Sequence, residues 1–86
     1  MSRLKYVKEV QDELSGIAAA LRAADGDAAG QIDAINTGCY TTSTEYLVEA
    51  LGLMQQLQRR AAVRQAGLES RLRALERSTR ELADLR

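Results

Sequence analysis

Three arginines on one stretch of the chain, Arg59, Arg60 and Arg64, have the type and spacing of a binding site. Most other arginines of the C-terminal half have a carboxylate one helical turn away, as Glu69 does for Arg73. These three have none, because no acidic residue occurs between residues 50 and 68. Arginine pairs with carboxylates while its stem packs on apolar atoms, and it is enriched at interface hot spots. The predicted partner-binding residues are Gln58, Arg59, Arg60, Arg64 and Gln65.

The expected partner of this segment is another protein with an acidic and apolar surface. The alternative is a basic surface that is simply solvated. A nucleic-acid partner is disfavoured, because the chain carries 12 basic and 12 acidic residues and has no Phe or Trp for base stacking.

Catalysis is not expected from the remaining reactive groups. The Cys39 thiol has no neighbouring base, since the chain lacks histidine and the nearest basic residues are Arg22 and Arg59. An ordinary loop thiol is expected, with an intermolecular disulfide or a partner contact as alternatives. The acids Glu9, Asp12 and Glu13 lie three and four residues apart, which is typical of a solvated helical face. We therefore expect no catalytic residue, metal or cofactor.

The residues that position this segment follow a heptad pattern typical of coiled coils. A first helix is predicted over about residues 3–36, on an apolar series with a spacing of seven: Val7, Leu14, Leu21, Ala28 and Ile35. Asp25-Gly26-Asp27 is the weakest point of this helix, and a break there is the alternative. We favour one continuous helix, because the apolar phase is unchanged across these residues.

A loop is predicted at about residues 37–42. Gly38 suits the left-handed conformation that ends many helices, and Thr42 with Glu45 fits a capping box at the start of the next helix.

The second helix is predicted over about residues 43–85. Its apolar series is Leu47, Met54, Ala61, Leu68, Leu75 and Leu82.

The expected fold is all-α: one domain of residues 1–86 that forms an antiparallel, coiled-coil-like two-helix hairpin. Two helices cannot cover an apolar seam on all sides. The hairpin is therefore expected to complete a four-helix bundle by dimerisation or by packing on a partner. The leucines predicted to form the oligomer seam are Leu68, Leu72, Leu75, Leu82 and Leu85.

These observations favour a non-enzymatic protein–protein interaction module, such as an adaptor, inhibitor, chaperone or structural subunit. A small nucleic-acid-binding hairpin dimer is the alternative. The Gly-bearing turn followed by Glu45-Tyr46 and a long helix also resembles the small helical-hairpin chaperones of type III secretion, which bind needle subunits as heterodimers. No signal peptide or membrane span is evident, so a cytoplasmic protein is expected.

Overall fold

The computed structural model describes residues 7–84, which form five helices and no strand. The helices are α1 (Val7–Leu21), α2 (Gly26–Thr37), α3 (Ser43–Leu57), the short α4 (Ala61–Gln65) and α5 (Glu69–Asp84). The all-α class predicted from the sequence is confirmed for these residues. The two long helices predicted over 3–36 and 43–85 are wrong, because each stretch is folded back on itself.

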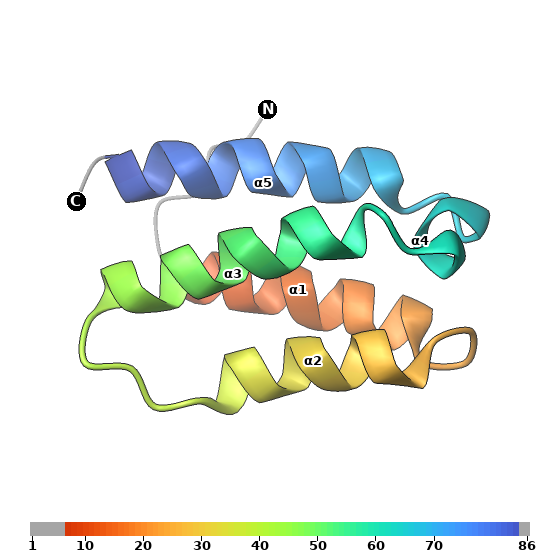
Figure 1. The fold of residues 1–86 in the computed structure, drawn as a ribbon. Coiled ribbons are helices and arrows are strands. Elements are labelled where there is room, and N and C mark those ends of the chain that lie inside the picture. Colours follow the sequence, from red (N-terminus) through yellow and green to blue (C-terminus); the bar gives the residue numbers. More distant parts are fainter. Residues whose placement is uncertain (1–6, 85–86) are drawn as a thin grey trace.

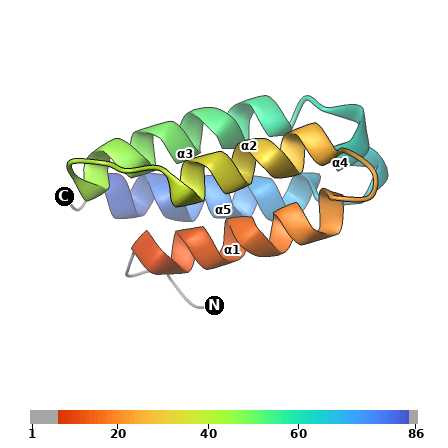
Figure 2. The same cartoon turned by 90° about the horizontal axis from the view of Figure 1, so that it is seen from below.

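The four long helices form two antiparallel hairpins that lie against each other (Figures 1 and 2). Helix α1 packs on α2, and α3 packs on α5. The hairpins meet where α2 contacts α3 and where α1 contacts α5. Helix α4 lies at one end, beside the turn between α1 and α2 (Figure 1). The result measures 34 × 29 × 18 Å, far shorter than the hairpin of two uninterrupted helices that was expected.

The first predicted helix is interrupted between Leu21 and Gly26. The backbone N–H groups of Ala24 and Asp25 donate to the carbonyl of Leu21, at 3.0 and 2.7 Å, and close the end of α1. The Asp25 carboxylate then accepts a hydrogen bond from the N–H of Ala28 at 3.1 Å, which caps α2. The chain thus reverses at Asp25-Gly26-Asp27, the weakest point of the predicted helix. The prediction of one continuous helix across these residues is wrong.

The apolar phase misled the prediction because Leu21 and Ala28 are buried on two different helices. Both side chains face the same core, Leu21 from α1 and Ala28 from α2. Ala24, which a continuous seam would bury, is exposed in the turn. A preserved spacing of seven therefore does not distinguish one helix from two antiparallel ones when a four-residue turn separates them.

The second predicted helix is interrupted twice, after Leu57 and after Gln65. At the second interruption Gly67 has a φ of +72°, in the left-handed region. The N–H of Leu68 donates to the Val63 carbonyl at 3.0 Å, and that of Gly67 donates to the Arg64 carbonyl at 3.1 Å. This pair of bonds is a Schellman motif, and the accompanying apolar residues Val63 and Leu68 are both buried.

The core of the described residues is built from apolar side chains of all five helices and of Leu68. The predicted seam residues Leu68, Leu72, Leu75 and Leu82 are buried in this core, with at most 8% of each residue exposed. Helix α5 packs on α3 and α1 of the same chain, so the burial of these leucines does not require an oligomer seam. Leu85 lies outside the described residues.

The connection between α2 and α3 contains the predicted cap but not the predicted glycine conformation. The hydroxyl of Thr42 accepts from the N–H of Glu45 at 3.2 Å, while the Glu45 carboxylate accepts from the N–H of Thr41 rather than Thr42. Gly38 has φ −68° and ψ 154°, an ordinary extended conformation. Its constraint is steric, because a Cβ would lie 3.1 Å from the Tyr40 ring and 3.2 Å from the Ala34 carbonyl oxygen.

Replacing Gly67 by alanine should destabilise the fold by about 1 kcal/mol, because residues with a Cβ resist a positive φ. Gly30→Ala is the matched control. Gly30 lies within α2 and has open space where a Cβ would be added, so the change should stabilise by up to about 1 kcal/mol. Urea unfolding monitored by circular dichroism would measure both free energies of unfolding. Equal effects of the two substitutions would contradict the assigned turn.

Thr79 on α5 gives a second stability prediction, because its hydroxyl is fully buried and has no hydrogen-bond partner among the described residues. Thr79→Val preserves the shape and removes the unsatisfied hydroxyl, so it should raise the free energy of unfolding by about 1 kcal/mol. Thr79→Ser keeps the hydroxyl and loses the methyl group, so it should lower that energy. A loss of stability in the valine variant would indicate that the hydroxyl has a partner.

Candidate functional site

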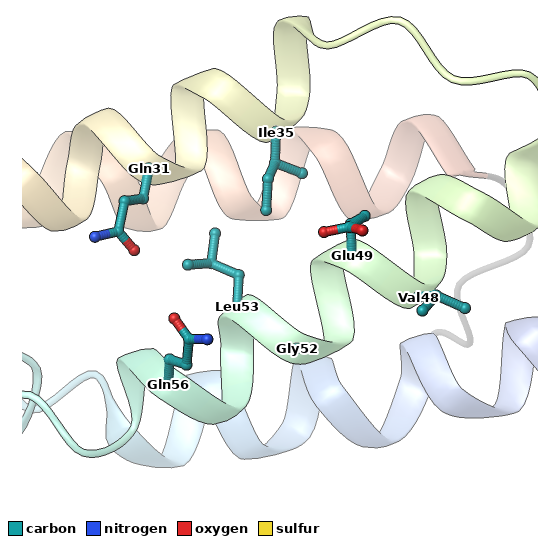
Figure 3. Close-up of a pocket in the computed structure, with 7 residues that line it drawn as sticks. All are labelled: Gln31, Ile35, Val48, Glu49, Gly52, Leu53 and Gln56. Carbon is teal, nitrogen blue, oxygen red and sulfur yellow. The ribbon is translucent and has the colours of Figure 1, made fainter.

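A groove between α2 and α3 is the candidate site (Figure 3). Ile35 of α2 and Leu53 of α3 point toward one another across it, and the amides of Gln31 and Gln56 lie toward one end. The groove has a volume of about 400 Å³ and is open to solvent along its length. Its full lining consists of Gln31, Ile35, Val48, Glu49, Gly52, Leu53 and Gln56.

A second hollow of about 330 Å³ continues this groove toward the α2–α3 loop. The two hollows share Val48 and Glu49, and the second adds Tyr40, Thr44 and Glu45. Val48 is 60% exposed and is the one large apolar side chain within residues 7–84 that is classed as exposed. We refer to both hollows together as the α2–α3 groove.

Gly52 leaves the middle of the groove open. A glycine inside a helix costs roughly 1 kcal/mol relative to alanine. Such a cost is usually offset by close packing, yet a Cβ at Gly52 would meet no atom within 4 Å. The core therefore does not require this glycine, and its effect is to keep the surface of α3 low between Val48 and Gln56.

A polar network holds the two helices that line the groove. The Asn36 amide nitrogen donates to the Gln11 carbonyl and to the Ser15 hydroxyl, both at 3.0 Å. The Tyr46 hydroxyl donates to the Asn36 side-chain oxygen at 2.8 Å. Burial raises the pKa of Tyr46 well above its usual value, which keeps this hydroxyl protonated as a donor. Tyr40 packs edge-on against the Tyr46 ring at 5.6 Å. Helices α1, α2 and α3 are thereby tied together beside Ile35.

The charge of the groove is acidic. Glu45 and Glu49 contribute two exposed carboxylates, and no basic side chain lines either hollow. Within residues 7–84 no group of three or more His, Cys, Asp or Glu residues is arranged to hold a metal ion. Apolar and amide groups next to carboxylates can contact a polypeptide surface, but they form no acid–base or nucleophilic constellation.

Arg60, which the sequence left without a carboxylate, pairs with Asp25 from the other half of the chain. The guanidinium Nε and Nη2 donate to the two carboxylate oxygens at 2.6 and 3.0 Å. The Asp25 side chain is only 15% exposed. The hydrogen bond from Arg60, together with that from the Ala28 N–H, lowers the pKa of Asp25. The premise that Arg60 is free to meet a partner is therefore wrong.

Two more of the predicted binding residues also have partners within the chain. Arg64 lies 3.4 Å from the Glu69 carboxylate. The Gln58 amide donates to Glu76 at 2.7 Å, and this bond is the main reason why the pKa of Glu76 is lowered. Arg59 and Gln65 are exposed, as is Cys39 in its loop. The five residues cluster around the turns next to α4 and do not contribute to the α2–α3 groove.

The groove residues were missed because the sequence prediction placed α2 and α3 beside the loop of a two-helix hairpin and assigned their facing positions to a closed apolar seam. The available signal was Val48, an apolar residue adjacent to the seam position Leu47, followed by Gly52 one turn later. Apolar and small residues beside a seam mark a second apolar strip. The predicted hairpin already brings this strip near Ile35 across the loop of residues 37–42, but the pattern did not reveal that the contact between the two helices leaves a groove.

The Asp25–Arg60 pair should make stability depend on pH. Because the folded-state pKa of Asp25 is lowered, its contribution is present above about pH 4 and is lost as the pH falls through the folded-state pKa. Asp25→Asn retains an N-cap acceptor and removes the charge. This variant should be less stable than wild type at pH 7, and the difference should shrink at low pH. Urea unfolding across this pH range tests it, and a constant difference would contradict the pairing.

No protein-family model, curated protein or solved structure matches the chain. Its function must therefore be inferred from the geometry of the described residues.

Proposed function

We propose that this protein is a non-enzymatic interaction module that binds another protein on the α2–α3 groove. The observation that carries the proposal is Val48, which remains exposed above a hollow although the other large apolar residues of α3 are buried or partly buried. Val48 adjoins the partly buried Tyr40 and Ile35 and is surrounded by glutamate and glutamine side chains of the groove lining, so a partner would find apolar contacts bordered by polar groups there. Gly52 supports the same role, because it keeps the groove open at a cost to helix stability.

The non-enzymatic part of the proposal comes from the composition of the chain, which lacks histidine and has one cysteine. A cytoplasmic location is likewise inferred from the sequence. Within residues 7–84 no helix combines the length and apolar character that crossing a membrane requires.

The sequence predicted a partner with an acidic surface that binds the arginine segment. We now propose that the partner binds the α2–α3 groove instead. Arg60 and Arg64 already have carboxylate partners, and so do Arg71, Arg73 and Arg80 on α5. This pairing also weakens the argument for a nucleic-acid-binding dimer, which would need these cations for phosphates. A chaperone of the type III secretion kind would be one form of the proposed module, but no particular groove contact favours it.

Site-specific photo-crosslinking in the native cells tests the proposal directly. A benzophenone side chain replaces Val48, and a matched variant carries it at Ala74, an exposed position on α5 outside the groove. Because both positions are exposed, both variants should fold, as circular dichroism would verify. We expect a discrete adduct with another protein at position 48 and none at position 74. Mass spectrometry would then identify the crosslinked protein.

A folded position-48 variant that gives no adduct with another protein would refute the groove as the binding site. Equal adducts at positions 48 and 74 would also refute it, since they would indicate unselective contact.

A further inference from the structure

We propose that the α2–α3 groove accepts an amphipathic helix of a different protein, with an apolar stripe flanked by Lys or Arg. This inference rests on the proposed function and specifies its partner. Four features of the described residues support it: the charge of the groove, its length, its apolar contacts and the absence of a complementary apolar surface elsewhere.

The charge of the groove requires a basic partner. Glu49 has no ion-pair partner within the described part of the chain, and it lies at the point where the two hollows meet. Glu45 is nearby and accepts only one backbone hydrogen bond, from Thr41. Neither carboxylate faces a cation of its own chain across the groove. A Lys or Arg beside the apolar contacts would pair with them, and an acidic partner would be repelled.

The length of the groove fits a short helix. Its lining on α3 runs from Thr44 to Gln56, which corresponds to about 18 Å, or roughly three helical turns. A partner helix of about 12 residues would span it. Helices that lie in such grooves place apolar anchors at positions i, i+3 or i+4, and i+7.

The apolar contacts are also spaced for a helix. Ile35 and Leu53 are apolar lining residues of the first hollow, and Val48 and Tyr40 are those of the second. Gly52 lies between them and leaves room for a close approach. Addition of a peptide as a β-strand is not available, because the described residues contain no strand and therefore no sheet edge to extend.

The described residues of a second copy do not fit the groove. Val48 is the one large exposed apolar residue within residues 7–84, so this part of the chain offers no other apolar stripe to fill the groove. A symmetric pairing of two grooves would place Glu45 and Glu49 of one copy near the same carboxylates of the other. The like charges would oppose that contact.

Selection from a defined peptide library tests the inference on the full chain. The library presents helix-forming 14-residue peptides with apolar anchors at i, i+4 and i+7, and with every flanking position randomised among Lys, Glu, Gln and Ser. The same anchors are also presented on non-helical peptides interrupted by proline. Binders of wild type are counter-selected against Val48→Asp, while Ala74→Asp serves as the surface control.

We expect helical binders enriched in Lys at the flanking positions, with affinity at least about tenfold weaker for Val48→Asp and unchanged for Ala74→Asp. Glu49→Lys should weaken these binders about threefold or more at low salt. Asp12→Lys, the same charge change at an exposed position on α1, should leave affinity unchanged apart from a small nonspecific effect. Affinity should fall as salt rises.

Two failures are distinguishable. Val48-dependent binders that are acidic, uncharged or non-helical would overturn the inferred partner chemistry and leave the groove as a binding site. Finding no Val48-dependent binder would overturn this inference, and the crosslinking experiment would decide independently whether the groove binds a protein of another kind.

Discussion

The carboxylate of Asp25 makes the interaction on which the arrangement of the helices depends. It caps α2 through the N–H of Ala28, and it pairs with both donor atoms of the Arg60 guanidinium. The first contact starts α2 in a new direction, directly after the turn that ends α1. The second fixes the α1–α2 turn to the residue that precedes α4. One side chain therefore ties together the two chain reversals at this end of the molecule. A bidentate pair is suited to this task, because its geometry restricts orientation as well as distance.

The opposite end is held differently, by the neutral network around Asn36 and by the packing of Tyr40 on Tyr46. The α2–α3 contact therefore has an ion pair at one end and neutral hydrogen bonds at the other. Among the described residues no hydrogen bond or ion pair joins the two helices between these ends. The part between them is the α2–α3 groove, where Gly52 carries no side chain that would cover the surface beside Ile35 and Leu53 (Figure 3). The polar contacts that join these elements thus lie at the two ends of the groove and leave its middle to the apolar side chains of Ile35 and Leu53.

Helical content, the Thr42 cap and the burial of most seam residues were predictable, because they depend on local periodicity and capping chemistry. The two chain reversals, between α1 and α2 and between α3 and α5, were harder to predict. Leu21 and Ala28 preserve the heptad spacing across a turn, and Ala61 and Leu68 preserve it across α4 although Ala61 is exposed. Arg60 was misassigned because its partner Asp25 is 35 residues away and lies in a turn that a continuous first helix does not contain. The α2–α3 contact was part of the predicted hairpin, but spacing alone does not show that Val48 and Gly52 border an open groove there.

The order of the helices has a consequence for how the chain reaches this structure. Most of the packing joins each long helix to the one that precedes it, through α1 on α2, α2 on α3 and α3 on α5, while the contact of α1 with α5 and the Asp25–Arg60 pair join distant segments. Most contacts thus close short loops, which have a small entropic cost, and proteins of such low contact order fold in microseconds to milliseconds. The two hairpins can form early and independently. Docking the α1–α2 hairpin on the α3–α5 hairpin, through α2 with α3 and α1 with α5, then completes the core.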